Sequence, residues 1–206
     1  MKVVGLITEY NPFHNGHQFH IEQAKLITDA DAVIVVMSGD FVQRGEPAIM
    51  PKHLRAEAAL KCNADLVIEL PFCYATESAE QFAIGAVSIF EKLGIVDSIC
   101  FGSECGDIQS LTEIAQILSN ESDEYKASLQ KQLRTGDSFP VAREKAMKEL
   151  FPDKNYGQIL SEPNNILGIE YIKALLKLGA DSNISANCIS SLATIVLITV
   201  LGSEID

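Results

Sequence analysis

Short apolar runs alternate with amphipathic segments along the first half of the chain. The runs are four to six residues long and predict strands buried on both faces of a sheet, at Val3–Ile7, Ala32–Met37, Leu66–Leu70 and Ser98–Phe101. The segments between them have helical spacing, at His17–Ile27, Pro51–Cys62 and Glu77–Leu93. Strands that alternate with helices in this way predict an α/β fold with a parallel, doubly wound sheet.

The second half of the chain changes from alternating elements to helices alone. Apolar spacing predicts helices at Asp107–Leu118, Glu124–Arg134, Phe139–Leu150 and Ile166–Leu178. Asn164 or Asn165 is expected to cap the last of them. The end of the chain has few turn signals and an apolar β-branched run at Thr194–Leu201. We therefore predict a core at 1–106, a helical segment that continues the domain at 107–180, and an atypical tail at 181–206.

Composition excludes several classes of protein. With 206 residues, 47% of them hydrophobic and 21% charged, the chain is neither disordered nor of low complexity. Its five cysteines form no C-x-x-C pair, which argues against a disulfide scaffold and a cysteine-based zinc site. The first apolar run is too short for a signal peptide, and Leu192–Leu201 is about half the roughly 20 residues of a membrane span. We expect a cytoplasmic protein with reduced thiols and no membrane association.

The charge is distributed unevenly along the sequence. The formal net charge is −12, which argues against broad nucleic-acid binding. Residues 125–155 are the exception, since they contain seven Lys or Arg and four Asp or Glu. If the chain binds RNA, this stretch, which includes Lys131, Arg134, Arg143 and Lys145, is the expected contact.

The strongest chemical signal is the sequence His14-Asn15-Gly16-His17, between the first predicted strand and the first predicted helix. A strand-to-helix turn presents unpaired backbone N–H groups and the positive end of a helix dipole, which together favour anions. Gly16 lets a phosphate approach the backbone, and both imidazoles can donate hydrogen bonds to it. The alternative is a pair of surface histidines in a loop. At the end of a strand in an α/β chain, we favour a phosphate site.

Phe101-Gly102-Ser103-Glu104 ends the fourth predicted strand, at the sheet edge where open α/β folds bind ligands. Gly102 there would let an adenine lie against the backbone, although the motif also fits an ordinary turn. Asn164 lies in a third motif, Pro163–Gly168, which also fits a simple helix cap.

The loop Met37–Pro47 follows the second predicted strand and is rich in glycine and polar residues. It brings Ser38, Gln43 and Arg44 to the same sheet edge, where Arg44 can hold a carboxylate or phosphate in bidentate fashion. The alternative is an exposed turn with a solvated arginine. We predict these three as substrate-binding residues and predict no metal ligands.

Five segments together carry a resemblance to a known family. They read GLITEYNPFHNGH, MSGDFVQRGEPA, DLVIELPF, FGSE and PNNILGIEYIKAL in this sequence. The chain resembles the bacterial tRNA(Met) cytidine acetate ligases from Met1 to about Leu178. The resemblance implies a Rossmann-like HUP nucleotidyltransferase domain that activates acetate with ATP, with Mg²⁺, to acetyl-adenylate. It also implies transfer of the acetyl group to N4 of the wobble cytidine of elongator tRNA(Met).

The resemblance also implies which residues form the ATP site. His14 and His17 are the expected catalytic groups. Gly102 and Asn164, further along the chain, are expected to bind ATP. The remaining expected ATP-binding residues form one run: Ile7, Thr8, Glu9, Tyr10, Asn11, Pro12, Phe13, His14, Asn15, Gly16, His17, Gln18, Phe19 and His20.

The sequence departs from the family pattern after Leu178. Family members have an Arg-Ile pair and a later Ser-Ala-Thr-x-x-Arg motif, whereas Cys188-Ile189 stands near the first place and no Lys, Arg or His follows Lys177. We therefore expect a truncated or frame-shifted tail that contributes nothing to the ATP site, and an inactive ligase. Two alternatives stay open: a small-molecule adenylyltransferase, and an inactive nucleotide-binding or tRNA-binding fragment.

Overall fold

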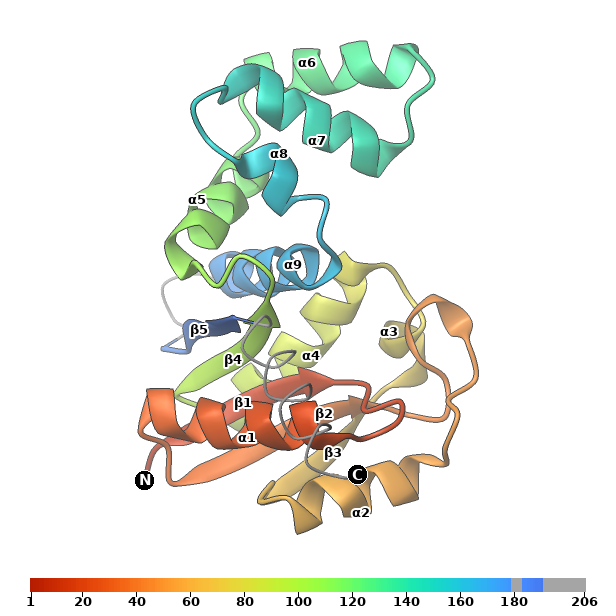
Figure 1. Cartoon of the computed structure of the whole chain (residues 1–206), viewed down its shortest axis with the longest axis vertical. Coiled ribbons are helices and arrows are strands. Elements are labelled where there is room, and N and C mark those ends of the chain that lie inside the picture. Colours follow the sequence, from red (N-terminus) through yellow and green to blue (C-terminus); the bar gives the residue numbers. More distant parts are fainter. Residues whose placement is uncertain (179–182, 191–206) are drawn as a thin grey trace, which may run out of the picture.

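The computed structural model describes residues 1–178 and 183–190 of the chain. Figure 1 shows the sheet and its flanking helices in the lower part of the molecule and α6, α7 and α8 at the upper end. The elements are β1 (Val3–Thr8), α1 (Asn15–Thr28), β2 (Ala32–Ser38), the 3-10 turn η1 (Gln43–Gly45), α2 (Lys52–Lys61), β3 (Leu66–Leu70), α3 (Phe72–Ala75), α4 (Ala79–Leu93), β4 (Ser98–Ser103), α5 (Ile108–Ser119), α6 (Asp123–Arg134), α7 (Phe139–Leu150), α8 (Tyr156–Ile159), α9 (Pro163–Leu178) and β5 (Ser185–Ser190).

The five strands form one parallel sheet in the order β3-β2-β1-β4-β5. β1 is central: Gly5 is in register with Ile34 of β2 on one side and with Ile99 of β4 on the other. The chain builds outward from β1 to β3, then returns to β4 on the opposite side. Open α/β sheets bind ligands at such a switch point, outside the carboxyl ends of the strands. The predicted α/β fold with a parallel sheet is confirmed.

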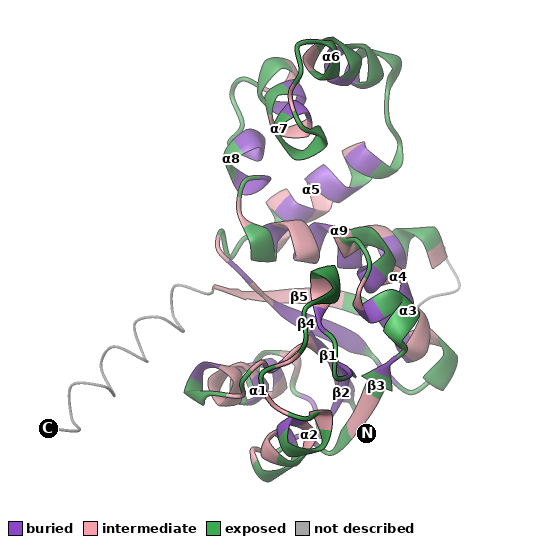
Figure 2. Ribbon diagram, turned by 90° about the vertical axis from the view of Figure 1, so that its right-hand side faces the viewer, coloured by how far each residue is buried: buried purple, intermediate pink, exposed green. Residues whose placement is uncertain are grey.

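Helices cover both faces of the sheet. Successive side chains of β1 point to opposite faces, and each face packs into its own apolar cluster. Leu6 packs with Ile21 of α1 and other residues on the α1 and α2 face. Ile7 packs with Phe90 of α4 and with α9 on the opposite face. Figure 2 shows the central strands as the buried layer between these helices. The two motifs at the ends of β1 and β4 therefore start from a rigid, two-sided core.

Part of the predicted tail joins the sheet. Ser185–Ser190 form β5, which is in register with β4 from Ser98 to Ser103. This strand has no continuous apolar run because it lies at the sheet edge, paired on one side and only half-buried. The apolar run Thr194–Leu201, also part of the predicted tail, lies outside the described residues.

The helical segment is tied to the core by apolar packing and by one buried ion pair. Leu111 of α5 and Met147 of α7 belong to the same apolar cluster as α4 and α9. Arg143 of α7 contacts Glu170 of α9 at 3.3 Å, and these side chains are 11% and 5% exposed. Arg143 is therefore a buried structural residue, which corrects its expected place in an RNA contact. None of the described helices is long and apolar enough to cross a membrane.

Candidate active site

A cleft of about 660 Å³ opens at the carboxyl ends of β1 and β4. Its volume lies within the range of small-molecule and cofactor sites. The lining residues come from the end of β1 and the loop after it, from α1, η1, α4 and α9, and from the ends of β4 and β5: Ile7, Thr8, Glu9, Tyr10, Asn11, Pro12, His14, Gly16, His17, His20, Gln43, Phe82, Gly102, Glu104, Asn164, Leu167, Tyr171 and Ile189. The predicted phosphate site and the predicted adenine site thus face the same space.

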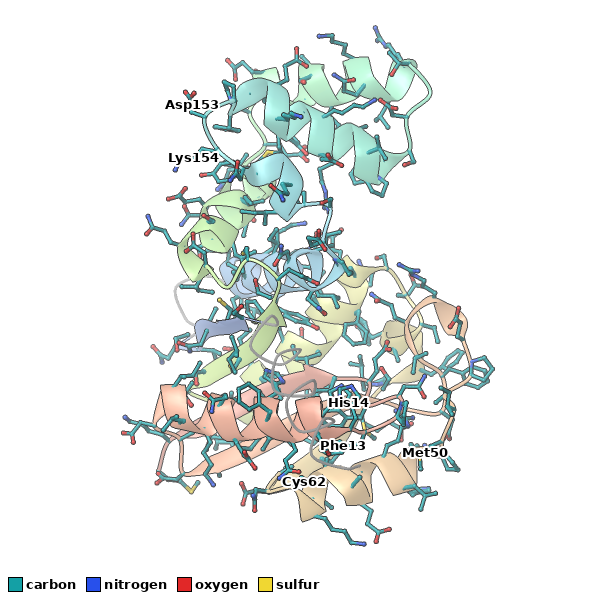
Figure 3. The ribbon with its side chains drawn as sticks, viewed as in Figure 1. Phe13, His14, Met50, Cys62, Asp153 and Lys154 are labelled. Atoms are coloured by element: carbon teal, nitrogen blue, oxygen red, sulfur yellow. The ribbon has the colours of Figure 1, made fainter. Side chains whose placement is uncertain are left out.

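His14 and His17 form a reciprocal capping box at the start of α1. His14 is the N-cap; its Nδ1 accepts a hydrogen bond from the Gly16 amide at 3.1 Å, and its own amide donates to Nδ1 of His17 at 3.3 Å. The two rings stack with centroids 3.7 Å apart. A nitrogen that accepts carries no proton, so Nε2 is the nitrogen that carries the proton in each ring. Each imidazole therefore has one N–H left to donate. Figure 3 shows His14 at this end of α1.

Burial keeps the deeper histidines neutral. Burial, and then the neighbouring His14 and His20, lower the pKa of His17 to about 3. Burial lowers the pKa of His20 to about 4, and its Nε2 has no hydrogen-bond partner among the described residues. The Tyr10 ring, 4.8 Å from His17, forms part of this enclosure. At neutral pH these side chains act as hydrogen-bond donors or acceptors, not as fixed cations.

Arg55 of α2 connects the loop after β1 to the loop after β2. Its side chain is fully buried and donates to the carbonyls of Glu9 and Gly39, to that of Ser38 at 3.2 Å, and to that of Met50 at 3.0 Å. Its fixed fork of donors is what allows one residue to hold carbonyls from separate loops. Arg55 thereby sets the position of the chain just after β1, where the cleft begins.

Side-chain acceptors on the loop after β1 also bind the loop after β2. The Glu9 carboxylate accepts from the Gln43 amide at 2.8 Å, and the Asn11 carbonyl oxygen accepts from the Ile49 amide at 2.7 Å. Both acceptors follow β1, and both donors belong to the loop after β2. The two loops therefore form one connected rim.

Glu104 connects the end of β4 to the start of α9. Its carboxylate accepts from the backbone and side-chain amides of Asn164, at 3.1 and 2.8 Å, and from the Asn165 amide at 2.8 Å. The expectation that Asn164 or Asn165 caps this helix is therefore wrong: the helix begins at Pro163, and a carboxylate 60 residues earlier caps it. The Asn165 side chain instead accepts from the Ser103 hydroxyl at 2.7 Å.

Gly102 borders open space. A Cβ placed on it would meet no atom within 4 Å, and the residue lines the cleft. A side chain there would project into the volume that a ligand needs. The interpretation of Gly102 as a close-approach position thus stays a prediction with a clear geometric basis.

The structure gathers most of the predicted site residues but not all of them. The predicted residues that do not line the cleft are Phe13, Asn15, Gln18, Phe19, Ser38 and Arg44. Ser38 is fully buried, and its carbonyl binds Arg55. Arg44 is exposed, with a left-handed φ of 69°. Of the three predicted substrate-binding residues, Gln43 alone borders the cleft.

Sequence reasoning missed residues that the fold brings to the cleft, namely Phe82, Leu167, Tyr171 and Ile189. In the sequence, Phe82 and Tyr171 look like core residues of amphipathic helices, and they are indeed 3% and 4% exposed. Glu104 was visible within its motif, but no local signal connects it to α9. Ile189 also corrects the expectation that the tail contributes nothing here.

Comparison with known protein families gives a match over most of the chain. Residues 1–191 match the model of the family described as HIGH Nucleotidyl Transferase. The chain belongs to the HIGH nucleotidyl transferase family. The matched residues include the His14–His17 turn at the start of α1.

Individual relatives narrow the comparison. The chain is 57% identical over 179 residues to the tRNA(Met) cytidine acetate ligase of Acetivibrio thermocellus, a match that covers 86% of this chain and 43% of that protein. It is 53% identical to the same ligase of Clostridium novyi, covering 86% of this chain and 45% of that protein. The chain therefore spans less than half the length of these curated relatives.

A solved structure has the same fold. Thermotoga maritima TmcAL, crystallised with alpha-thio ATP bound, is 42% identical and superposes with a TM-score of 0.86, covering 98% of this chain and 51% of that one. The apo form of the same protein also superposes with a TM-score of 0.86.

Proposed function

We propose that this chain binds ATP in the cleft between β1 and β4 and activates acetate as acetyl-adenylate, for transfer to N4 of the wobble cytidine of elongator tRNA(Met). One observation carries the proposal: two stacked imidazoles cap a helix at the end of β1 and leave their Nε2–H groups free at the cleft. The ligase names of the curated relatives and the ATP analogue in the T. maritima structure support it.

In the proposed first step, a carboxylate oxygen of acetate attacks the α-phosphorus of ATP. The bond from this phosphorus to the oxygen that bridges to the β-phosphate breaks, and pyrophosphate leaves with the electron pair. His14, His17 and the amides at the start of α1 would stabilise the charge on the leaving pyrophosphate. In the second step, the cytidine N4 attacks the acetyl carbon, AMP leaves, and N4 loses a proton.

Mg²⁺ would enter as a complex with ATP. The described residues contain no group of three His, Cys, Asp or Glu arranged to hold a metal ion. The cleft instead offers N–H donors, which suit phosphate oxygens and not a cation. The two carboxylates at the cleft, Glu9 and Glu104, are engaged by backbone amides.

For tRNA, we propose a contact on the outer helical segment, through cations that no described acid neutralises. Lys131 is paired with Glu149 and Lys145 with Asp137, each at 2.8 Å. Within residues 125–155, the cations without an ion pair to a described residue are Lys126, Arg134 and Lys148. Figure 3 shows Lys154, at the end of this stretch, far above His14.

Changing Lys126, Arg134 and Lys148 to Glu should weaken binding of a tRNA(Met) transcript. The slope of log affinity against log salt should fall by about 0.7–0.9 for each phosphate that the variant no longer neutralises. Changing the paired Lys131 and Lys145 instead is the matched control. An unchanged affinity and salt slope in the triple variant would place the tRNA-binding surface elsewhere.

ATP–pyrophosphate exchange with the 206-residue chain tests the activation step. The sequence of the tail predicts an inactive chain, but Ile189 of that tail lines the cleft, so we now expect acetate-dependent exchange. His17→Ala should lower it about 10²–10³-fold, the usual cost of removing one preorganised donor. Exchange that requires a phosphorylated metabolite and not acetate would overturn the proposal.

The second candidate is nucleotide binding without ligase chemistry. It is favoured by one observation: residues 178–206 contain no Lys, Arg or His to help neutralise a triphosphate. Calorimetric ATP binding, combined with no exchange under any acid, would support this candidate over the first.

A further inference from the structure

One wall of the cleft is apolar and has no part in the phosphate site. Phe82 of α4 and Leu167 and Tyr171 of α9 line it, together with Ile7 at the end of β1. All four belong to the apolar cluster on the α4 and α9 face, whereas Tyr10, which encloses His17, packs on the α1 face. The cleft therefore has a polar side for phosphates and a separate apolar side.

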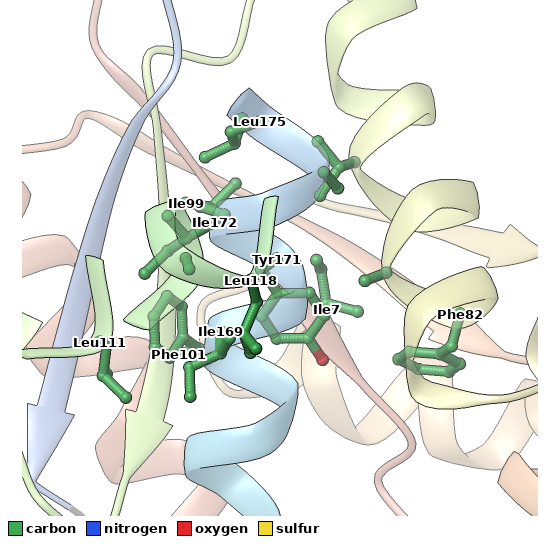
Figure 4. Packing of buried hydrophobic residues seen from close by; sticks show 14 of the residues in the cluster. Ile7, Phe82, Ile99, Phe101, Leu111, Leu118, Ile169, Tyr171, Ile172 and Leu175 are labelled. Atoms are coloured by element: carbon green, nitrogen blue, oxygen red, sulfur yellow. The ribbon is translucent and has the colours of Figure 1, made fainter. Parts of the chain in front are cut away.

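A single polar atom stands in this apolar wall. The Tyr171 side chain is 4% exposed, its ring centroid lies 5.6 Å from that of Phe101, and its hydroxyl makes no hydrogen bond to any described residue. Burial, and secondarily Glu9, raise the pKa of Tyr171, so the hydroxyl keeps its proton at neutral pH. Figure 4 shows Ile7, Phe82 and Tyr171, with the tyrosine oxygen in red. Tyr171 lines the cleft and its oxygen is not among the fully buried unpartnered polar atoms, so the hydroxyl opens to the cleft, where it can donate to an acceptor on a ligand.

The wall is held too firmly to adapt to larger groups. α9 packs so closely on β4 that a Cβ on Gly168 would lie 2.4 Å from the Phe101 ring. Phe82 is 3% exposed within the same cluster. Rigid apolar walls discriminate ligands by length, and one methylene is worth about ten- to two-hundred-fold in selectivity.

Away from the phosphate side, the charges nearby favour an acid that carries a single negative group. Glu9 and Glu104 border the cleft and would repel a second carboxylate or phosphate pushed toward them. The N–H donors of His14 and His17 belong to the opposite side. A short monocarboxylate fits, because its one charge can face the hydroxyl and the phosphate side while its methyl group contacts the apolar side chains.

We propose that Ile7, Phe82, Leu167 and Tyr171 form the acid-binding subsite, in which Tyr171 donates to the carboxylate of the incoming acid and Phe82 limits its chain length. The inference rests on the proposed function, because that function supplies the acid to be bound. It adds the residues that select a two-carbon acid, which sequence reasoning did not identify.

Binding of ¹³C-labelled acetate, followed by NMR in the presence of a non-hydrolysable ATP analogue, tests the subsite without requiring catalysis. We expect Tyr171→Phe to weaken acetate binding about tenfold or more, as for a hydrogen bond to a charged group, and to leave affinity for the ATP analogue unchanged. Tyr125→Phe is the matched control, because Tyr125 is also buried with an unpartnered hydroxyl but lies in α6.

Phe82→Leu tests the length limit with a substitution that a core position tolerates. The parent should prefer acetate to propionate, and Phe82→Leu should reduce that preference about tenfold or more. A merely structural role for Phe82 would lower both affinities together and keep their ratio.

The outcomes separate this inference from the proposed function. Tyr171-dependent acetate binding without any exchange would support the subsite and count against the ligase chemistry. Acetate-dependent exchange with an unchanged acetate affinity in Tyr171→Phe and an unchanged acid preference in Phe82→Leu would overturn the subsite and leave the ligase proposal standing. No acetate binding to the parent chain would overturn the subsite as well.

Discussion

Replacing Gly102 by valine should separate ligand binding from folding. The structure puts no atom within 4 Å of the added Cβ, and the position is on a β-strand, where a β-branched residue is well tolerated. The free energy of unfolding should therefore change by no more than about 0.5 kcal/mol. The new side chain projects into the cleft, and forcing a ligand around such a group costs about 1–3 kcal/mol, or roughly 5–150-fold in Kd for ATP.

Thermal unfolding with and without ATP measures both effects at once. At an ATP concentration about 100 times the parent's Kd, binding stabilises the parent by about 2.7 kcal/mol, whereas a variant with 100-fold weaker binding gains only about 0.4 kcal/mol. At roughly 2–4 °C per kcal/mol for a chain of this size, the difference is easily measured. A graded series of Gly102→Ala, Val and Leu should weaken binding stepwise. Parent-like ATP stabilisation in Gly102→Val would refute the placement of the nucleotide against β4.

Gly168→Ala is the opposite case and serves as the control. Its Cβ would lie 2.4 Å from the Phe101 ring, so α9 or the ring must move. Such overpacking should lower the free energy of unfolding by about 1–3 kcal/mol. An unchanged melting temperature in Gly168→Ala would show that the close packing of α9 on β4 is wrong.

Three further changes test the buried residues and hydrogen bonds that hold the site in place. The folded state keeps His17 and His20 neutral, with pKa values near 3 and 4, while unfolded histidines bind protons below about pH 6.5. The free energy of unfolding should thus fall from pH 6.5 toward pH 4 by up to about 1.4 kcal/mol per pH unit for each histidine. Urea unfolding of His20→Asn should show a shallower dependence on pH. An equally steep pH profile in that variant would argue against a neutral, buried His20. Arg55→Met should cost about 3–5 kcal/mol by leaving buried carbonyls unpaired, and Arg55→Lys should not restore the loss, as denaturant titration would show. Glu104→Gln should lower the free energy of unfolding by about 1 kcal/mol and speed hydrogen exchange at the Asn164 and Asn165 amides. Parent-like exchange at these amides would show that Glu104 does not cap α9.

The part of the fold that the sequence predicts is the part encoded locally. β1 and β2 are continuous apolar runs because both faces are covered, so their pattern alone marks them as strands. The His14–His17 turn is recognisable because glycine and histidines follow such a run directly. β5 carries no such pattern, since Ser185–Ser190 lie at an edge with half-buried side chains, and it was missed.

The rest of the site depends on contacts between distant segments. In the sequence, Arg55 looks like an exposed residue of an amphipathic helix, because the carbonyls of Glu9, Ser38 and Gly39 that it binds come from positions 16 to 46 residues away. Glu104 caps a helix that starts some 60 residues later, in place of the nearby asparagines that propensity favours. Neither partner is visible until β1, β2 and β4 lie side by side.

The strand order explains why the cleft has two chemically different sides. Because β1 is paired with both β2 and β4, the end of β1 lies where the chain connections diverge. α1 leaves β1 toward one face and brings the two histidines and the positive end of its dipole. α4 and α9 pack on the other face and bring Phe82 and Tyr171. The proposed reaction transfers the adenylyl group of ATP to a small acid and releases pyrophosphate, so it needs both environments within one cavity. The switch point supplies them from opposite faces of the sheet, so substitutions on the α1 side should alter nucleotide chemistry and those on the α9 side should alter the choice of acid.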